Sequence, residues 1–171
     1  MIDIHSHLVP GVDDGSQSIE ESLRLLKQAE IEGITEIITT PHYMKNGDFR
    51  TKAAELVQRF NALKETYQGT IKLHLGNELY IHPDLPELLE QGEILTLAES
   101  NYILVEFPFH EYKEDYDEIL YELSLKYQII IAHPERYSYV QDDPNFCLQW
   151  LKEGYLLQSN QNSLFKKETR K

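Results

Sequence analysis

The chain has 171 residues, 41% of them hydrophobic, which supports one domain with a core of its own. Sixteen basic against 29 acidic residues give a formal net charge of −13. This charge argues against a nucleic-acid partner, because such binding depends mainly on phosphate neutralisation by Lys and Arg. A single cysteine excludes an internal disulfide, and neither a signal peptide nor a membrane-spanning apolar run is present. We therefore expect one soluble, cytoplasmic domain, peripheral to a membrane at most.

The first fifteen residues carry a dense group of polar side chains. Residues 2–4 predict a short strand, and His5 and His7 follow at its end. Side chains two residues apart face the same side of a strand, so the two imidazoles project together. A turn then leads to Asp13 and Asp14. Imidazoles and carboxylates that converge suit zinc, iron or manganese. The alternative is that the histidines are ordinary polar residues at a strand end and that the aspartates form a turn.

The rest of the chain alternates predicted strands with predicted helices. Strands are expected at residues 2–4, 34–40, 71–75, 102–105, 128–132 and 155–158. Helices are expected at residues 19–33, 53–67, 86–91, 112–127 and 144–153. Ser18 and Glu21 form a capping box before the first helix. This alternation is typical of βα units around a parallel sheet, which is either a closed barrel or an open doubly wound sheet.

Side chains of the kind that bind metals follow the predicted strands one after another. They are His5 and His7, His42, Glu78, Glu106 and His133. In a closed barrel the carboxyl ends of all strands meet at one mouth, whereas an open sheet spreads them along a line. The pattern therefore favours the barrel and a metal site at its mouth, although each residue taken alone is compatible with an ordinary loop or surface position. Three other histidines lie inside a strand or in loops and are expected not to bind metal: His74, His82 and His110.

Arg136 lies three residues after His133 and adds a phosphate-binding group. A guanidinium binds two phosphate oxygens at once, so an arginine beside a metal site indicates a phosphoryl substrate. The alternative is a surface salt bridge with Glu135 or Asp143. The sequence has no glycine-rich nucleotide loop and no GxSxG motif, and Cys147 lies in a predicted helix with no phosphate-binding loop after it. Metal-assisted hydrolysis of a phosphate ester is the chemistry that remains.

Five motifs together resemble the polymerase-and-histidinol-phosphatase (PHP) superfamily. They are HSH at 5–7 with PGVDDGS at 10–16, TPH at 40–42, GNE at 76–78, VEFP at 105–108 and HPERY at 133–137. More narrowly, they resemble its bacterial capsule and exopolysaccharide branch, the manganese-dependent tyrosine-protein phosphatases. The resemblance covers residues 1 to about 165.

The resemblance implies an α/β fold, a distorted TIM-like (βα) barrel, with a cluster of three divalent metals, manganese first and zinc or iron as alternatives. One metal would be held by His5, His7 and Glu78, a second by Glu78, Glu106 and His133, and the third with the help of Asp14 and His42. Arg136 would contact the phosphate. The implied substrate is phosphotyrosine on the tail of a membrane-associated tyrosine autokinase that regulates polysaccharide export.

The sequence departs from that family near its C-terminus. No histidine follows His133 and no aspartate follows Asp143, so the family's final Asp-x-His pair is missing. We therefore expect a single PHP-type domain over residues 1–171 that lacks its last βα units, binds metal weakly, has little activity and self-associates. Two other functions stay open: a PHP phosphatase for a small metabolite such as histidinol phosphate, and a catalytically inactive binding module.

Overall fold

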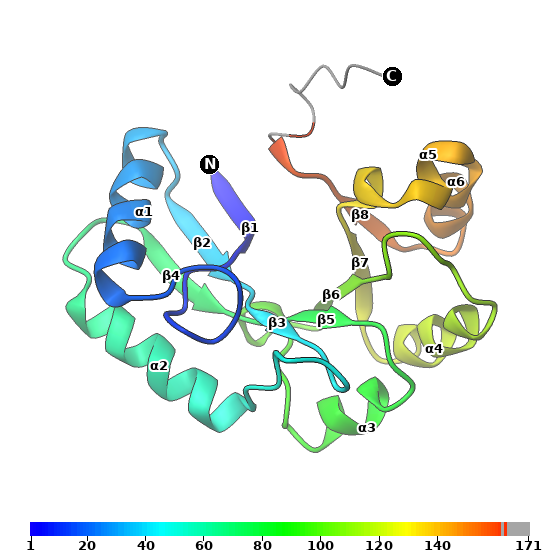
Figure 1. The fold of residues 1–171 in the computed structure, drawn as a ribbon, viewed down its shortest axis with the longest axis horizontal. Helices are drawn as coiled ribbons and strands as arrows, with labels where there is room; N and C mark the ends of the chain where they lie inside the picture. Colours follow the sequence, from blue (N-terminus) through cyan, green and yellow to red (C-terminus); the bar gives the residue numbers. More distant parts are fainter. Residues whose placement is uncertain (162, 164–171) are drawn as a thin grey trace.

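Two parallel β-sheets form the centre of the molecule in a computed structural model, which describes residues 1–161 and residue 163 (Figure 1). The first sheet has the order β1-β2-β4, with β1 at Ile2–Ser6, β2 at Glu36–Thr39 and β4 at Lys72–Leu75. The second has the order β3-β5-β6-β7-β8, with β3 at His42–Tyr43, β5 at Glu78–Tyr80, β6 at Tyr102–Glu106, β7 at Gln128–Ala132 and β8 at Leu156–Gln158. Every strand pair is parallel.

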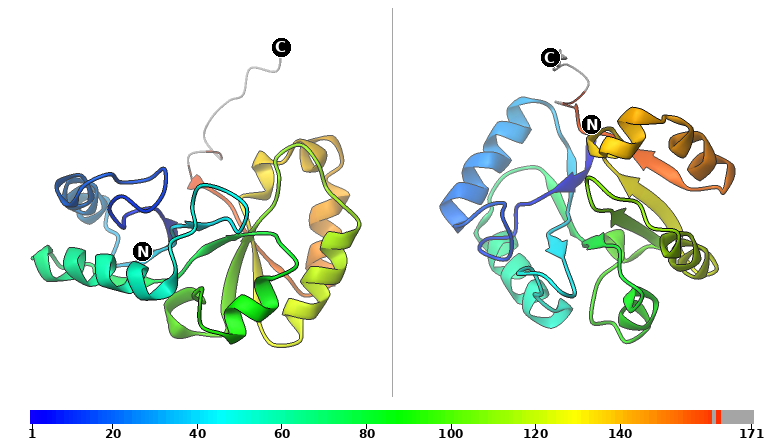
Figure 2. Two further views of the ribbon diagram at one scale, coloured as in Figure 1. Left: turned by 60° about the horizontal axis from the view of Figure 1, so that its bottom comes forward. Right: turned by 45° about the vertical axis from the view of Figure 1, so that its right-hand side comes forward.

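The helices lie outside the sheets (Figures 1 and 2). They are α1 at Ile19–Ile31, α2 at Ala53–Thr66, α3 at Leu85–Glu90, α4 at Asp115–Ser124, α5 at Ser138–Asp142 and α6 at Asn145–Lys152. The predicted cap of α1 is present, because the backbone N–H of Glu21 donates to the Ser18 hydroxyl at 3.2 Å. Among the described residues, no helix combines the length and the apolar character that crossing a bilayer requires.

Each sheet has a hydrophobic core on its helical side. Leu26, Ile37 and Leu63 are buried together where α1 and α2 cover the first sheet. Ile103, Leu120 and Ile129 belong to the larger core under α3, α4 and α6. A third, smaller cluster lies on the opposite faces of the strands. Burial on both faces explains why the strand sequences are continuous apolar runs. Each fully buried Leu or Ile side chain stabilises the folded state by about 1.5–3 kcal/mol.

The two sheets are joined where the chain passes from β2 to β3 and from β4 to β5. The sequence predicted one strand over 34–40, but Pro41 has no N–H to donate, and the chain continues after it as β3 in the second sheet. In the second bend the Asn77 side chain donates to the Pro41 carbonyl at 3.0 Å and accepts from the Leu95 N–H at 2.9 Å. The structure thus has two short strands, β3 and β5, and a short helix, α5, that the sequence analysis did not predict.

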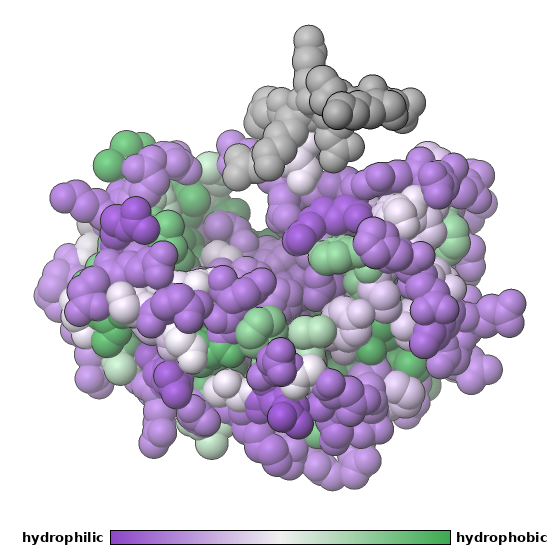
Figure 3. Space-filling view, in the orientation of Figure 1, coloured by the Kyte–Doolittle hydropathy of each residue, from purple (hydrophilic) through white to green (hydrophobic). Residues whose placement is uncertain are grey.

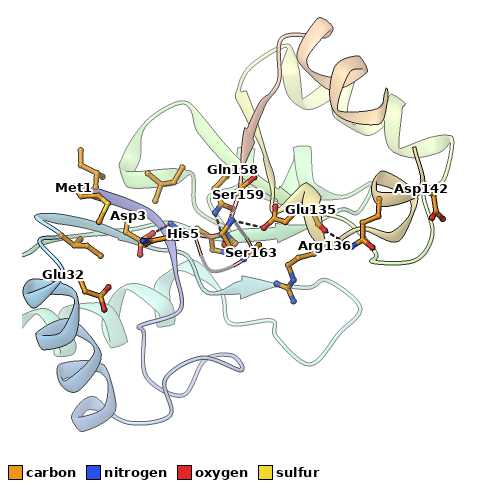
Figure 4. A pocket seen from close by; sticks show the side chains of 16 residues that line it. Met1, Asp3, His5, Glu32, Glu135, Arg136, Asp142, Gln158, Ser159 and Ser163 are labelled. Atoms are coloured by element: carbon orange, nitrogen blue, oxygen red, sulfur yellow. Dashed lines mark hydrogen bonds between the residues drawn. The ribbon is translucent and has the colours of Figure 1, made fainter. Parts of the chain in front are cut away.

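The α/β fold with parallel sheets is confirmed, but the strands do not close into a ring within the described part of the chain. Among the strands of residues 1–161, β1 pairs with β2 alone and β8 pairs with β7 alone. A cavity of about 1520 Å³ lies between these two edges, lined among others by Asp3, Glu135 and Gln158 (Figure 4). Figure 3 shows this hollow with hydrophilic residues along most of its rim. The edge strands therefore face an open space.

Candidate metal centre

The seven side chains predicted to bind metal converge where the carboxyl ends of β1, β6 and β7 meet the first residues of β3 and β5. They form three groups whose ligand atoms lie within 4.8 Å of one another: His5, Glu78 and His133; His7, Asp14 and His42; and His42, Glu78 and Glu106. The structure therefore brings side chains from different strands together at one place. His74, His82 and His110 belong to none of the groups found in residues 1–161 and 163.

Glu78 lies at the centre of this arrangement and is completely buried. Its Oε2 atom is 3.0 Å from His5 Nε2, 3.2 Å from His7 Nε2 and 3.2 Å from His42 Nδ1. Its Oε1 atom is 2.8 Å from His133 Nε2. One carboxylate therefore faces four imidazoles that come from three different segments of the chain.

The distances between these atoms suit a shared cation. Two atoms that bind one ion at about 2.1 Å and at about 90–110° lie roughly 3.0–3.4 Å apart. The three atoms expected at the first metal fit this range, because His5 Nε2 and His7 Nε2 are 3.2 Å apart and both lie 3.0–3.2 Å from Glu78 Oε2. His42 Nδ1 is buried without a hydrogen-bond partner among the described residues. Such atoms are costly to bury unless an ion binds them, and this donor set suits manganese, iron or zinc.

Local structure directs the ligands from β6 and β7. The buried Tyr137 hydroxyl donates to the Ala132 carbonyl at 2.8 Å and accepts from the Phe107 N–H at 3.1 Å. This pair of hydrogen bonds joins the ends of the two strands next to Glu106 and His133. His133 itself has a left-handed backbone, with φ of 30°, which is rare outside glycine and is often found at functional sites. This bend turns its imidazole toward the cluster.

Asp13 orients the cluster, a role that the sequence analysis did not assign. Its carboxylate accepts hydrogen bonds from His7 Nδ1 at 2.6 Å and from the backbone N–H groups of His42 and Gly15, both at 3.0 Å. A carboxylate that binds the second nitrogen of a metal-binding histidine fixes its tautomer and ring position. The only sequence signal was that two aspartates are adjacent, and the sequence does not tell which of them binds the histidine.

Gln158 on β8 has a similar role on the other side of the cluster. Its Oε1 atom lies 2.8 Å from His5 Nδ1 and also accepts from the backbone N–H of His133 at 3.3 Å. When His5 Nδ1 donates this hydrogen bond, its Nε2 atom is left free for a metal. Figure 4 shows Gln158 and His5 among the side chains that line the larger cavity. No sequence pattern marks a single glutamine at the end of a strand.

We expect Asp13→Asn to weaken metal binding about 10- to 100-fold, the usual loss when a partner of a metal-binding histidine is removed. The asparagine keeps the size of the side chain and can still accept from one of the two backbone N–H groups, but it loses the charge that holds His7. Titration of the metal-free protein with manganese measures the change. Asp48→Asn, in an exposed loop, is the matched control. An unchanged affinity would show that Asp13 does not orient the cluster.

Burial and charge change the pKa values within the cluster. Burial alone would lower the pKa of His7, but the hydrogen bonds to Asp13 and Glu78 outweigh it and raise the pKa to about 10. Burial and the nearby Glu78 charge raise the pKa of Glu106 to about 8. Burial of Glu78 opposes its ionisation, yet the hydrogen bonds from His133, His5 and His7 hold its pKa well below the usual value. Without metal, therefore, the cluster holds protons near neutral pH.

We expect the metal-free protein to lose stability as the pH rises from about 6.5 to about 8.5. His7 has a raised pKa. Its contribution to folding stability is therefore complete when the pH is below its ordinary pKa of 6.5, and it is lost as the pH approaches 10. Glu106 keeps its proton in the folded state up to about pH 8, whereas its ordinary pKa is 4.5, so its contribution to stability already falls from about pH 4.5 and is lost by about pH 8. After screening, a loss of about 1–2 kcal/mol corresponds to a melting temperature roughly 2–8 °C lower.

Thermal unfolding in EDTA at the two pH values measures this change. The Glu106→Gln variant has no titratable proton at this position, so its melting temperature should depend less on pH. A melting temperature that rises with pH in EDTA would contradict the pKa directions.

Arg136 lies beside a second cavity of about 500 Å³ that opens onto the cluster. Its guanidinium carbon is 4.6 Å from the centre of the Phe109 ring. None of the ion pairs formed by the described residues includes Arg136, so the alternative of a salt bridge with Glu135 or Asp143 is not observed there. The guanidinium therefore stays available to an anion at the cluster.

The chain was compared with protein families, characterised proteins and solved structures. Residues 1–171 match the family described as capsular polysaccharide synthesis, CpsB/CapC. The chain is 33% identical over 168 residues to the tyrosine-protein phosphatase YwqE of Bacillus subtilis, with 96% of this chain and 66% of YwqE covered. It is 34% identical over 168 residues to the putative tyrosine-protein phosphatase CapC of Staphylococcus aureus, with 96% and 66% covered.

A structural comparison agrees with the sequence comparison. The fold matches a chain from the crystal structures of YwqE from Bacillus subtilis and CpsB from Streptococcus pneumoniae, described as unique metal-dependent tyrosine phosphatases, with a TM-score of 0.85 and 32% identity. This match covers 93% of the present chain and 66% of the other. The chain thus spans just under two thirds of the length of these relatives. Because the family match extends over all 171 residues, the chain belongs to the CpsB/CapC family of capsular polysaccharide synthesis.

Proposed function

We propose that the chain is a metal-dependent phosphotyrosine-protein phosphatase built as one PHP-type domain. Its proposed substrate is phosphotyrosine on the tail of a membrane-associated tyrosine autokinase that regulates capsule or exopolysaccharide synthesis. The chain would act on this tail in the cytoplasm. The observation that carries the proposal is the group of four imidazoles around Glu78, with Arg136 beside the adjoining cavity. The names of the relatives point to the same activity.

The proposed metal ligands are the seven residues of the three groups: His5, His7, Asp14, His42, Glu78, Glu106 and His133. Manganese is the first candidate, with zinc and iron as alternatives, since all three accept imidazole and carboxylate ligands. Such ions lower the pKa of bound water and neutralise charge on a phosphoryl group. Because the ligands come from five strands or their adjoining loops, the arrangement supports a distorted TIM-like barrel whose strand ends meet at the site.

The chain's own residues would bind and orient the phosphate. Arg136 offers two N–H groups in a plane that matches two phosphate oxygens. Asp13 and Gln158 hold His7 and His5 in position through their outer ring nitrogens. Glu78 would be shared between metals, because both its oxygens face imidazoles. None of the described residues that line the cavity is a cysteine or serine, so hydrolysis would not proceed through a phosphocysteine or phosphoserine.

A phosphatase assay with metal analysis tests the proposal. The purified chain is stripped with EDTA, reloaded with manganese, and assayed with a phosphotyrosine peptide and with histidinol phosphate. We expect metal-dependent release of phosphate from the peptide in preference to the metabolite. Preference for histidinol phosphate would favour a metabolite phosphatase. Metal binding and peptide binding without turnover would indicate an inactive binding module instead.

A further inference from the structure

The strand β3 carries His42 to the metal centre, although it is the shortest strand of the two described sheets. It consists of His42 and Tyr43 and lies at the edge of the second sheet, where it pairs with β5 (Figure 1). This pairing places His42 opposite Glu78, and the His42 Nδ1 atom is 3.2 Å from Glu78 Oε2. A ladder of two residues offers few backbone hydrogen bonds. A further contact is therefore needed to keep His42 at this distance.

The side chain of Asn77 supplies such a contact. Its Nδ2 group donates to the carbonyl of Pro41, the residue before His42, at 3.0 Å. The backbone N–H of Glu78, the residue after Asn77, donates to the same carbonyl at 3.1 Å. Because proline has no N–H of its own, this carbonyl is the one backbone group through which Pro41 can be held by a hydrogen bond. One side-chain amide thus links the two residues that come just before two of the proposed ligands.

The other end of the Asn77 amide is held by the segment between α3 and β6. The backbone N–H of Leu95 donates to Asn77 Oδ1 at 2.9 Å. A carbonyl can only accept and an N–H can only donate, so the two partners determine which end of the amide is the nitrogen. Asn77 is 1% exposed, and a Cβ atom added at the preceding Gly76 would come within 2.8 Å of the Leu97 side chain. The amide is therefore fixed at both ends in a tightly packed bend.

We propose that Asn77 is a positioning residue of the metal centre: its amide sets the spacing between His42 and Glu78 and so determines how tightly the two groups that contain His42 bind metal. These groups are His7, Asp14 and His42, and His42, Glu78 and Glu106. The inference rests on the proposed function, because it takes the cluster to bind metal. Glu78 has a second support, since β5 also pairs with β6, whereas β3 is at the edge of the sheet. The group without His42 should therefore keep its affinity.

Manganese titration of Asn77→Asp tests this role, with electron paramagnetic resonance measuring the manganese that stays free. Aspartate keeps the shape and still accepts from the Leu95 N–H, but its carboxylate cannot donate to the Pro41 carbonyl. We expect the ions at the two His42 groups to bind about 10- to 100-fold more weakly, as for other residues that support a metal ligand. The added negative charge favours cation binding, so it cannot cause a loss. Asn101→Asp, at an exposed position before β6, is the matched control.

A double-mutant cycle separates this role from a general effect on the fold. If Asn77 acts through His42, Asn77→Asp should cause no further loss of manganese affinity in the His42→Ala background. Circular dichroism and thermal unfolding in EDTA show whether each variant is folded. Asn77→Ala, which removes both hydrogen bonds of the amide, takes the place of Asn77→Asp if the aspartate variant does not fold.

The outcomes separate this inference from the proposed function. Unchanged manganese binding in a folded Asn77 variant, or the same further loss in the His42→Ala background, would overturn the positioning role even if a phosphotyrosine peptide is hydrolysed. Failure of both Asn77 variants to fold with manganese present would also overturn it, because Asn77 would then be required by the fold itself. Weaker binding that depends on His42 would support the role even without hydrolysis, and then only the proposed activity would fail. An unmodified chain that binds no manganese would overturn both.

Discussion

Glu78→Gln should remove most of the metal from the protein and lower phosphotyrosine turnover more than about 100-fold, beyond the loss expected for a residue that only supports a ligand. Glutamine has nearly the same shape as glutamate but carries no charge. In the unmodified chain Glu78 Oε1 lies 2.8 Å from His133 Nε2, and Glu78 Oε2 lies 3.0 Å from His5 Nε2. The amide of glutamine has only one acceptor oxygen and cannot replace both. Loss of this one carboxylate therefore affects two of the three groups of ligand atoms.

Metal content by mass spectrometry and initial rates with a phosphotyrosine peptide measure the effect. The matched control is Glu36→Gln on β2, because Glu36 also faces a histidine, with 3.0 Å between its Oε2 atom and His74 Nε2, but is absent from the three groups. Circular dichroism must show that both variants are folded, since breaking a buried ion pair costs about 3–5 kcal/mol. A folded Glu78→Gln protein with full metal content and near-normal rates would refute the central position of Glu78 in the site.

The second large effect is expected for Arg136→Lys, which should lower kcat/KM for a phosphotyrosine peptide about 10- to 100-fold without changing the metal content. A hydrogen bond to a charged group contributes about 1.5–3 kcal/mol, and lysine cannot replace the paired N–H groups of the guanidinium. Lysine would also lose part of the planar contact with Phe109, which lies 4.6 Å from the guanidinium carbon.

Steady-state kinetics and metal analysis on the same samples test this prediction. Arg24→Lys on α1 is the control, since its side chain is 75% exposed and pairs only loosely with Glu21, at 3.6 Å. If metal content and activity fall together in the Arg136 variant, Arg136 supports the structure of the site rather than the substrate.

The sequence alone located the elements whose signals are local. The β-branched runs predicted the bounds of β2, β4, β6 and β7 to within two residues at either end. The spacing of apolar residues predicted α1 and α2. Local patterns were sufficient there because each element buries a face or a whole run of apolar side chains. The order of strands and polar residues also pointed to six of the seven residues of the three groups, since a side chain at a strand end is placed by the strand itself, and the family resemblance added Asp14.

Only the tertiary structure decided how these residues meet and what surrounds them. It made Glu78 the centre of the cluster, because β5 starts beside β3 and β6 and places this carboxylate among imidazoles from segments more than 30 residues away. It also brought Gln158 to His5 across 153 residues, separated the role of Asp13 from that of Asp14, and placed Arg136 and Phe109 on the cavity beside the cluster. None of these relations has a local signal, because each depends on contacts between segments that are distant in the sequence and are fixed only when the sheets pack.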